Sequence, residues 1–567
     1  MTTDCSSVAY FSMEIALDPA LPTYSGGLGV LAGDMLRAAA DLGVSMVGIA
    51  LVQRKGYFDQ HLDDLGNQSE SPTAWEPEKV VEPMLPVVTV RIEGRDVRVR
   101  AWRFLIKGLG GHVVPVYLLD TALPENSPWE QKLTDSLYGG DAHYRLCQEM
   151  VLGLGGVAIL PELGHSLISS YHMNEGHSAL LTLGLLEERL EGRALSSATE
   201  EDIHAIRAKC VFTTHTPVPA GQDQFPHDLV SRVLGEERTA ALEVTGACPA
   251  GSLNMTYLAL FGSRYINGVA MQHGEVSRGM FPNYPIRAIT NGVHAVTWMS
   301  PAFGDLFDRH IPEWRHDNLY LRYAIGIGTS EIREAHVQAK RRMVAELKQR
   351  TGVQLDEKVL TIGFARRAAT YKRADLIFRN LDRLRWIATH CGPIQIVFGG
   401  KAHPSDVGGK DLIRRIFESA AALKDVIKVV YIENYDWRVA PLLYAGADLW
   451  LNTPQRPQEA SGTSGMKAAL NGVPSFSVMD GWWVEGCLEG ITGWAIGHGP
   501  ESPDDEVFEI AALYDKLEMI ILPMFYGRPT AYAEVMRSAI AINGSFFNTQ
   551  RMLSQYLANA YFRPAVA

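Results

Sequence analysis

The sequence of 567 residues contains few cysteines and none of the patterns in which cysteines bind metal ions. The six cysteines lie far apart, no CxxC pair occurs, and no Cys/His cluster has the spacing of a zinc site. So few cysteines in so long a chain favour free thiols and a reducing compartment. We therefore predict a protein that uses neither a disulfide framework nor a bound metal.

A positive net charge and a long apolar segment are also absent. The formal net charge is -12 at pH 7, which argues against nucleic acid and anionic membranes as main partners, because both bind basic surfaces. No run of 18 apolar residues occurs, and the start MTTDCSSVAYFSMEIAL has no basic segment followed by an apolar one. These features predict a soluble, cytoplasmic protein without a signal peptide. Its size and composition are those of an enzyme.

The second half of the chain alternates short apolar runs with helical patterns. Strands are expected at 359–364, 394–398, 427–432, 449–452 and 475–478, and helices between most of them, for example at 374–388 and 410–423. This alternation predicts an α/β fold with a buried parallel sheet. Ligands of such sheets bind beyond the carboxyl ends of the strands, so a site is expected in the loops there.

The first half mixes strand and helix patterns. VVTVRI, the turn signal EGRD and VRVRAWRFLI predict a β-hairpin within 85–106, and HVVPVYLLD predicts a strand at 112–120. Helices are expected at about 141–160 and 178–190. The irregular segment NGVHAVTWMSP at 291–301 marks a domain boundary.

Two domains are therefore expected, over residues 1–296 and 297–567. Helices from about 317 to 350 lead into the second domain. The last segment, 540–567, is expected to return to the first domain as a helix.

A glycine-rich loop, Tyr24 to Gly29 (YSGGLG), precedes the helical stretch VLAGDMLRAAADLG. Glycines allow the backbone to approach a ligand closely, and free N–H groups at a helix start attract anions. The alternative is a tight turn that only begins a helix.

A basic cluster follows the strand TIGFA. It comprises Arg366, Arg367, Lys372 and Arg373, together with Tyr371. Cations at a strand end repel one another unless anions compensate, which favours an anion site. The alternative is a solvated basic helix start.

A second Gly/Ser/Thr-rich loop, EASGTSGMK at 459–467, lies between a strand and a helix. Lys467 falls in the first turns of that helix, where it opposes the helix dipole. Either it is exposed without a role, or it has a partner such as an aldehyde cofactor that forms a Schiff base. His215 in THTP and the segment Asn174–His177 also follow strands, and they indicate either a ligand loop or structural histidines.

Taken together, these stretches resemble the α-glucan phosphorylases, the family of glycogen, starch and maltodextrin phosphorylases, and most closely its shorter prokaryotic members. EASGTSGMK is similar to the family's cofactor-lysine motif, FARRAATYKR to its phosphate-binding stretch, and SGGLGVLAGD to its N-terminal glycine loop. ENYDWRVA, VFGGKAHP and TNGVHAVTW also match, and the motifs keep the family's order from about Tyr10 to Trp494. The resemblance implies two Rossmann-like domains that face each other across a deep cleft, the GT-B glycosyltransferase architecture.

The resemblance also implies the site residues. Lys467 would hold pyridoxal 5′-phosphate (PLP) as a Schiff base. The cofactor phosphate would be surrounded by Gly27, Arg366, Lys372, Thr463 and Ser464. Arg367 would bind the substrate phosphate, with Lys372 near both phosphates. The glucosyl unit would contact Gly26, His215, Asn291, Tyr371, Glu459, Ser461 and Gly462. The catalytic set is then Lys467, Arg367, Lys372 and His215.

The implied reaction is the reversible phosphorolysis of an α-1,4-glucan, such as glycogen or maltodextrin, by inorganic phosphate. It yields α-D-glucose 1-phosphate with retention of configuration, and the family uses the cofactor phosphate as a proton relay. Breaking a glycosidic bond passes through an oxocarbenium-like transition state, and the leaving hydroxyl needs a proton. Two phosphates in contact repel each other, and the basic cluster would compensate that repulsion.

Two alternatives remain open: a sugar-nucleotide glycosyltransferase of the same fold, and a glucan-binding protein without activity. A conventional PLP enzyme acting on amino acids is a weaker alternative. The chain is shorter than the animal and plant enzymes, so we expect no allosteric or phosphorylation control, and by analogy a homodimer.

Three local features remain uncertain from sequence. Arg366 stands where the longer members carry a lysine, and Asp436 stands where they carry an arginine, close to the presumed phosphate site. Trp482-Trp483 is either a sugar-stacking platform or part of the core.

Overall fold

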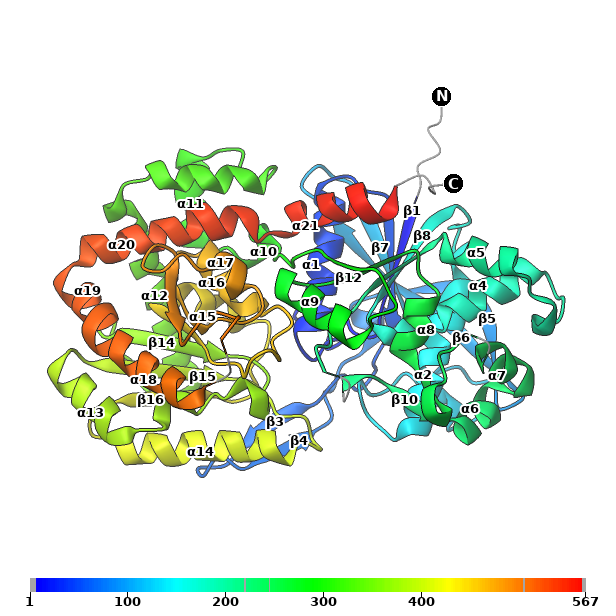
Figure 1. Ribbon diagram of the computed structural model, residues 1–567, viewed down its shortest axis with the longest axis horizontal. Helices are drawn as coiled ribbons and strands as arrows, with labels where there is room; N and C mark the ends of the chain where they lie inside the picture. The colour runs from blue at the N-terminus through cyan, green and yellow to red at the C-terminus, as the bar shows by residue number, and fades with distance from the viewer. Residues whose placement is uncertain (1–6, 219–220, 244, 503–504, 563–567) are drawn as a thin grey trace.

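The computed structural model describes residues 7–218, 221–243, 245–502 and 505–562. Two large sheets dominate these residues and lie in different halves of the molecule (Figure 1). Parallel strands make up most of both sheets, and helices lie between successive strands along the chain. The predicted mixed α/β class with parallel sheets is therefore confirmed.

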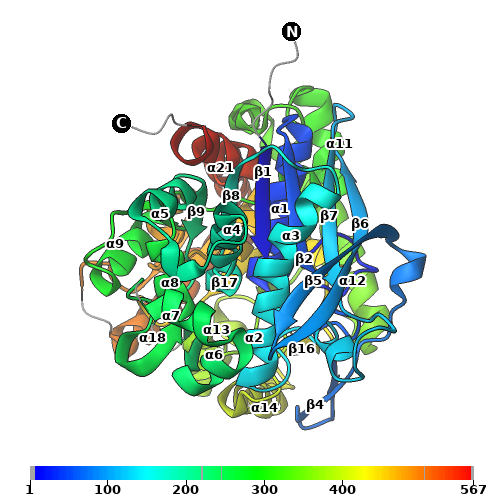
Figure 2. The same ribbon diagram turned by 90° about the vertical axis from the view of Figure 1, so that its right-hand side faces the viewer.

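The first sheet has nine strands in the order β13-β12-β9-β8-β1-β2-β7-β6-β5. Its first seven strands are parallel, and β6 and β5 continue it as antiparallel neighbours, visible at the edge of the sheet in Figure 2. This pair is the predicted hairpin, and β7 is the predicted strand that follows it. The strands are β1 (Ser7–Ser12), β2 (Met46–Leu51), β5 (Glu82–Ile92), β6 (Arg95–Lys107), β7 (Val113–Asp120), β8 (Ile168–Asn174), β9 (Cys210–Thr213), β12 (Tyr265–Gly268) and β13 (Ile286–Ala288).

The second sheet has six strands, all parallel, in the order β16-β15-β14-β17-β18-β19. Five of them match the predicted apolar runs. The sixth, β19, was not predicted, because four residues that begin with a glycine give no strand signal. The strands are β14 (Leu360–Ala365), β15 (Ile394–Gly399), β16 (Lys428–Ile432), β17 (Leu449–Asn452), β18 (Ser475–Val478) and β19 (Gly493–Ile496).

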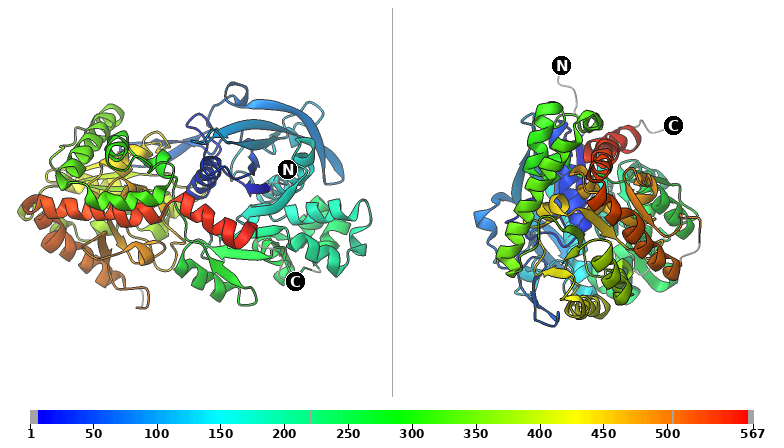
Figure 3. Two further views of the ribbon diagram at one scale, coloured as in Figure 1. Left: turned by 90° about the horizontal axis from the view of Figure 1, so that it is seen from above. Right: turned by 90° about the vertical axis from the view of Figure 1, so that its left-hand side faces the viewer.

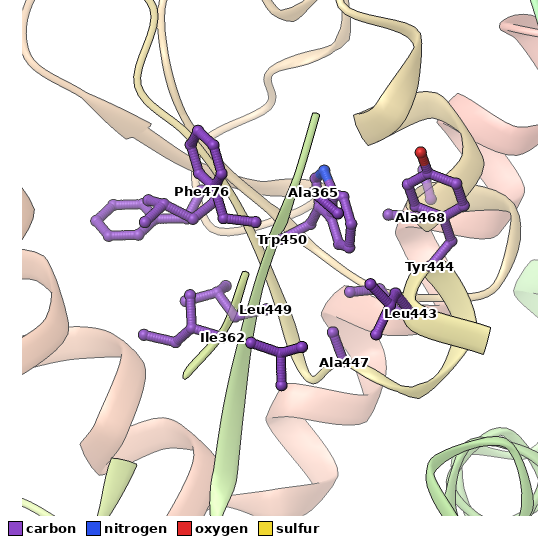
Figure 4. Close-up of a cluster of buried hydrophobic side chains, with 14 of the residues drawn as sticks. Ile362, Ala365, Leu443, Tyr444, Ala447, Leu449, Trp450, Ala468 and Phe476 are labelled. Carbon is purple, nitrogen blue, oxygen red and sulfur yellow. The ribbon is translucent and has the colours of Figure 1, made fainter. Parts of the chain in front are cut away.

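Aromatic and branched side chains fill the core beside this sheet. Trp450 of β17 is fully buried. Figure 4 shows it among Ile362 of β14, Phe476 of β18 and Tyr444 of the adjoining helix α15 (Ala440–Gly446). Side chains as large as Trp450 fix the spacing of strand and helix, because protein cores pack at high density.

Helices cover both sheets. Those of the first half are α1 (Gly27–Asp41), α2 (Ala142–Met150), α3 (Gly156–Glu162), α4 (Leu181–Leu190), α5 (Glu200–Arg207), α6 (His227–Leu234), α7 (Glu236–Glu243), α8 (Met255–Phe261) and α9 (Met271–Met280). Those of the second half are α10 (Ala295–Trp298), α11 (Pro301–His310), α12 (Thr329–Thr351), α13 (Leu381–His390), α14 (Val407–Leu423), α15, α16 (Thr463–Leu470), α17 (Trp483–Gly486), α18 (Glu506–Lys516), α19 (Leu522–Gly527), α20 (Pro529–Ser538) and α21 (Thr549–Tyr556).

One predicted helix begins at the wrong residue. The pattern at 374–388 is a short 3-10 turn at Leu376–Phe378, followed by α13, which starts at Leu381. Asn380 causes the break, because its side chain accepts a hydrogen bond from the N–H of Arg383 and thereby caps the new helix.

The end of the described chain packs against the first sheet. Helix α21 contacts α1, and the two lie side by side when the molecule is seen from above (Figure 3). The phenol of Tyr556 contacts the hydroxyl of Thr213 at 3.0 Å, and Tyr561 contacts Nδ1 of His172 at 2.6 Å. Segments far apart in sequence are thus joined beside the first sheet.

A small hairpin also connects the two large sheets. It consists of β3 (Asp59–Leu62) and β4 (Gln68–Ser71), and it reaches the region of α14 in Figure 1. Gln68 pairs with both backbone groups of Ala402, which lies after β15. None of the helices described is both long and apolar enough to cross a membrane.

Candidate active site

A cavity of about 1040 Å³ lies beyond the carboxyl ends of strands from both sheets. The rule for parallel sheets therefore locates it correctly. Its wall contains every site residue that the resemblance to the phosphorylases implies: Gly26, Gly27, His215, Asn291, Arg366, Arg367, Tyr371, Lys372, Glu459, Ser461, Gly462, Thr463, Ser464 and Lys467.

The glycine loop forms one wall of the cavity at the start of α1. A side chain at Gly26 or Gly27 would meet no atom within 4 Å, so the bare backbone borders open space. The N–H groups of Ser25 and Gly26 donate to the carboxylate of Glu14, at 2.5 and 3.0 Å. Glu14 thus holds the loop, and the first turn of α1 faces the cavity.

The basic cluster forms the opposite wall and is partly neutralised by Glu459. Oε2 of Glu459 accepts hydrogen bonds from Nη2 of Arg366 at 2.7 Å and from Nζ of Lys372 at 2.6 Å. Burial alone would raise the pKa of Glu459, but the two cations lower it on balance. Arg367 is exposed within the cavity wall, beside the ring of Tyr371.

Arg373, the remaining cation of the cluster, does not line the cavity. It has a positive φ of 45° and turns its guanidinium to Glu509 and to the carbonyls of Thr453 and Pro454. The prediction that Arg373 belongs to the anion site with the other cations is wrong. Arg373 is a buried structural residue.

Lys467 lies in a pocket made of aromatic rings. It is 4% exposed, and its Nζ lies 4.1 Å from the ring centre of Trp298 and 5.4 Å from that of Tyr444. Burial lowers the pKa of Lys467 to about 8, and the charge of Asp34 opposes this shift. The amine is therefore partly neutral near neutral pH, the form that attacks a carbonyl carbon.

The loop that leads into α16 brings further polar groups to the cavity. Gly462 has a φ of 88°, which favours glycine. The hydroxyl of Ser461 is buried and makes no hydrogen bond within the described part of the chain. The hydroxyl of Ser464, in contrast, has a partner: it accepts a hydrogen bond from the indole Nε1–H of Trp450 at 3.2 Å.

His215 and its neighbours come from the first sheet. The backbone N–H of His215 donates to Glu175 Oε2 at 2.7 Å, and its ring Nε2 lies 2.7 Å from Oδ1 of Asn174. Burial lowers the pKa of His215 to about 3, so the ring is neutral. Asn291 is anchored through its backbone carbonyl to Arg551 of α21, and its side-chain oxygen has no hydrogen-bond partner among the described residues.

Two uncertain features of the sequence are resolved. Asp436 lines the cavity, but its carboxylate accepts hydrogen bonds from the N–H groups of Arg438 and Val439. Trp482 and Trp483 are 2% and 0% exposed. The stacking-platform alternative for this pair is therefore wrong, and the core alternative holds.

Three buried carboxylates at or near the site were not predicted as site residues. Glu14 follows β1, Asp34 lies in α1 close to Lys467, and Asp480 follows β18. Asp480 accepts the backbone N–H of Glu459 at 2.9 Å and so orients the loop that carries it. Burial raises the pKa of Asp480 to about 7. Glu14 and Asp480 could have been found from their positions at strand ends. Asp34 lies inside a helix and gives no such signal.

Comparison with known proteins identifies the family. A family model described as carbohydrate phosphorylase matches residues 222–489. The chain is 38% identical to the maltodextrin phosphorylase of Thermococcus litoralis, over 98% of this chain and 70% of that protein. The chain belongs to the carbohydrate phosphorylase family.

Further relatives agree with this assignment. The glycogen phosphorylase of Mycobacterium tuberculosis is 36% identical, over 99% of this chain and 71% of that protein. The glycogen phosphorylase of Aquifex aeolicus is 33% identical, over 98% of this chain and 86% of that protein. The resemblance found in the sequence motifs is thereby confirmed, and with it the enzyme class, a phosphorylase.

Proposed function

We propose that this enzyme is a retaining α-1,4-glucan phosphorylase that uses PLP. It would transfer a glucosyl unit from a glycogen- or maltodextrin-type glucan to inorganic phosphate, reversibly, with α-D-glucose 1-phosphate as product. The observation that carries the proposal is the convergence of Lys467, Arg366, Arg367 and Lys372 with the glycine loop around one cavity. The names of the relatives support the same reaction.

The surroundings of Lys467 fit PLP. A planar aromatic aldehyde suits a pocket lined by Trp298 and Tyr444, and a partly neutral amine suits attachment of that aldehyde. The phosphate of such a cofactor would be held by Gly27, Arg366, Lys372, Thr463 and Ser464. The hydroxyl of Ser464 is engaged by Trp450, so its contribution would come from the backbone at the start of α16.

The charge of the cavity wall fits two phosphate groups. Around Glu459 the wall carries more positive than negative charge: Arg366 and Lys372 pair with this one carboxylate, and Arg367 lines the cavity beside them. The N-terminal ends of α1 and α16 add partial positive charge. Such a surplus stabilises anions that would otherwise repel each other.

In the proposed mechanism, Arg367 binds the substrate phosphate and Lys372 holds it against the anomeric carbon. When bound, the cofactor supplies an acidic phosphate that exchanges a proton with the substrate phosphate. The fixed guanidinium and ammonium groups stabilise negative charge as the glycosidic bond breaks, and they need no rearrangement to do so. The substrate phosphate gives a proton to the departing glycosidic oxygen, which leaves as the 4-hydroxyl of the shortened glucan. A phosphate oxygen then bonds to C1 on the same face, so the α configuration is retained.

The sugar-side residues would position the glucosyl unit. Asn291 and Ser461 each carry a buried oxygen without a hydrogen bond, and a sugar hydroxyl would satisfy either one. His215 is held by Glu175 and Asn174 so that its carbonyl and ring border the cavity. Gly26, Tyr371, Glu459 and Gly462 would complete this set. An enclosed site limits competing hydrolysis by water.

The same proposal extends to the domain architecture, the partners and the site of action. The two sheets would be the cores of two Rossmann-like domains in the GT-B arrangement, with the cavity as the cleft between them. The physiological partners would be an α-1,4-glucan, inorganic phosphate and glucose 1-phosphate. The site of action would be the cytoplasm.

The test combines cofactor content with turnover. Purified protein is assayed for PLP per chain and for phosphate-dependent release of glucose 1-phosphate from maltodextrin, in wild type, Lys467→Ala and Arg367→Ala. We expect about one PLP per chain in wild type and in Arg367→Ala, none in Lys467→Ala, and at least 100-fold lower turnover in both variants.

The alternatives predict different results. Transfer from a nucleotide sugar without PLP would replace the proposal by a glycosyltransferase. Glucan binding without turnover at any phosphate concentration would replace it by a binding protein.

A further inference from the structure

A buried carboxylate in α1 has no role in the proposed reaction. Asp34 lies about two helical turns after the start of α1 at Gly27 and is 1% exposed. Its Oδ2 accepts hydrogen bonds from the indole Nε1–H of Trp298 at 2.7 Å and from the backbone N–H of His294 at 3.1 Å. Its Oδ1 makes no hydrogen bond to any described residue and faces Nη1 of Arg37 at 3.6 Å.

Trp298, which Asp34 holds, is the ring closest to the amine of Lys467. The amine lies 4.1 Å from the centre of this ring, close enough for a cation–π contact. Trp437 packs against Trp298 with a ring separation of 4.9 Å, and the guanidinium of Arg37 lies 5.0 Å from the ring of Trp437. Asp34 therefore holds Trp298, and Arg37 contacts the neighbouring Trp437. The two indole rings pack against each other, and Trp298 contacts Lys467.

The hydrogen bond from Trp298 to Asp34 determines how the indole is turned. An indole has a single donor, Nε1–H, and a buried donor that loses its partner is costly. With Asp34 as acceptor, the ring has one favoured orientation toward Lys467. Without an acceptor, the indole must rotate or admit water, and either change opens the pocket around the amine.

We propose that Asp34 is a positioning residue for Lys467, which fixes the indole of Trp298 against the amine so that a bound aldehyde is held in one orientation. The inference rests on the proposed function for the identity of that aldehyde, PLP. The placement of Trp298 itself is observed. Asp34 does not touch the reacting atoms. Its charge also opposes the fall in the pKa of Lys467, and both Asp34→Ala and Asp34→Asn remove that charge. A difference between the two variants therefore reports the hydrogen bond to Trp298.

The test compares two substitutions of Asp34 with a matched control. Asp34→Ala removes the acceptor, whereas Asp34→Asn keeps a carbonyl oxygen that accepts from Trp298 and His294. The control is Asp41→Ala, which removes another buried carboxylate of α1. Asp41 contacts Nε2 of His294 at 2.8 Å. Within the described chain, none of its hydrogen bonds involves Trp298.

The first readout is the rate at which the holoenzyme loses PLP to a carbonyl trap, followed by cofactor absorbance. We expect Asp34→Ala to lose the cofactor at least tenfold faster than wild type, and Asp34→Asn and Asp41→Ala to stay within about threefold. Equal rates in Asp34→Ala and Asp41→Ala would overturn the proposal, since both changes then act only through general stability.

A second readout keeps the outcome separate from the proposed function. If the wild-type protein binds no PLP, the proposed function fails, and the positioning role is judged by acetylation of Lys467 with acetic anhydride, quantified by mass spectrometry. We expect at least tenfold faster acetylation of Lys467 in Asp34→Ala and less than threefold change in Asp34→Asn. An unchanged rate in Asp34→Ala would refute the positioning role.

Discussion

At the scale of single residues, Asp436 is the clearest case in which structure changes the meaning of a charge. From sequence alone, a carboxylate near a phosphate site is unfavourable. In the structure its Oδ1 accepts from the N–H groups of Arg438 and Val439, at 3.1 and 3.2 Å, just before α15. An Asp in this position stabilises a turn before a helix, because it satisfies N–H groups that lack partners.

Asp436 is therefore predicted to matter for stability and not for phosphate binding. We expect Asp436→Ala to lower the free energy of unfolding by about 1 kcal/mol, the usual value for losing a side-chain cap. The KM for phosphate should change less than twofold. Chemical denaturation and phosphate-dependent kinetics measure the two quantities. A several-fold decrease in the KM for phosphate would instead show that the carboxylate repels the substrate.

The pairing of Glu459 with Arg366 and Lys372 shows the limit of sequence reasoning at this scale. The three residues were placed in one site, but as separate contacts to sugar and phosphate. Oε2 of Glu459 lies 2.7 Å from Nη2 of Arg366 and 2.6 Å from Nζ of Lys372, although Arg366 and Glu459 are 93 residues apart in the sequence. No local pattern encodes such a contact, and the same is true of Asp34 and Trp298.

At the scale of elements, local patterns were sufficient where burial is regular. The hairpin β5–β6 alternates exposed and buried residues, and β14 and β15 are buried throughout, so period and composition were enough. The pattern failed at β19, which is short, and at the start of α13, which a cap determines. The basic cluster and the loop at 459–467 were found because each follows a predicted strand and precedes a predicted helix, and the glycine loop because it precedes a helical pattern.

The hairpin β3–β4 is the element whose role only the structure reveals. Gln60 donates to the carbonyl of Gly400 at 3.1 Å and accepts from the N–H of Asn434 at 3.0 Å, and Gln68 bonds both backbone groups of Ala402. These loops follow β15 and β16 and border the cavity. The hairpin thus acts as a strap that fixes the loops of the second sheet from the first half of the chain.

Removing one of these buried amides should loosen the strap. We expect Gln60→Ala to cost about 1 to 3 kcal/mol, because the N–H of Asn434 loses its partner and Gly400 and Gln68 each lose a hydrogen bond. Hydrogen exchange of the amides at 399–403 should become faster. The neighbouring exposed His61→Ala on the same strand should stay within about 0.5 kcal/mol. Unchanged exchange in Gln60→Ala would contradict a strap role.

At the scale of the whole molecule, the polar interior makes stability depend on pH. His172 and His273 are buried and His215 is half-buried, and the loss of hydration lowers their pKa values to about 3, 4 and 3. His172 also connects distant parts of the chain, since its ring contacts Tyr561 at the C-terminal end and Thr213 in β9. Its neutral form is therefore tied to the packing of the last helix on the first sheet.

The sign of the pH effect follows from proton binding. An unfolded histidine takes up a proton near its ordinary pKa of about 6.5, whereas folded His172 does not until about pH 3. The stabilising contribution is complete above about pH 6.5 and is lost as the pH falls toward 3. Between pH 7 and pH 5 a single such histidine accounts for about 2 kcal/mol.

We therefore expect wild-type protein to lose stability between pH 7 and pH 5 by about 2 kcal/mol more than His172→Gln, in which this titration is removed and hydrogen bonding to Tyr561 and Thr213 remains possible. Urea unfolding at the two pH values measures the difference, and the comparison of slopes cancels any constant cost of the substitution. Exposed His390→Gln on α13 serves as the control and should keep the wild-type pH dependence. Parallel profiles for wild type and His172→Gln would mean that the folded ring takes up its proton as readily as the unfolded one, and would contradict a buried, neutral His172.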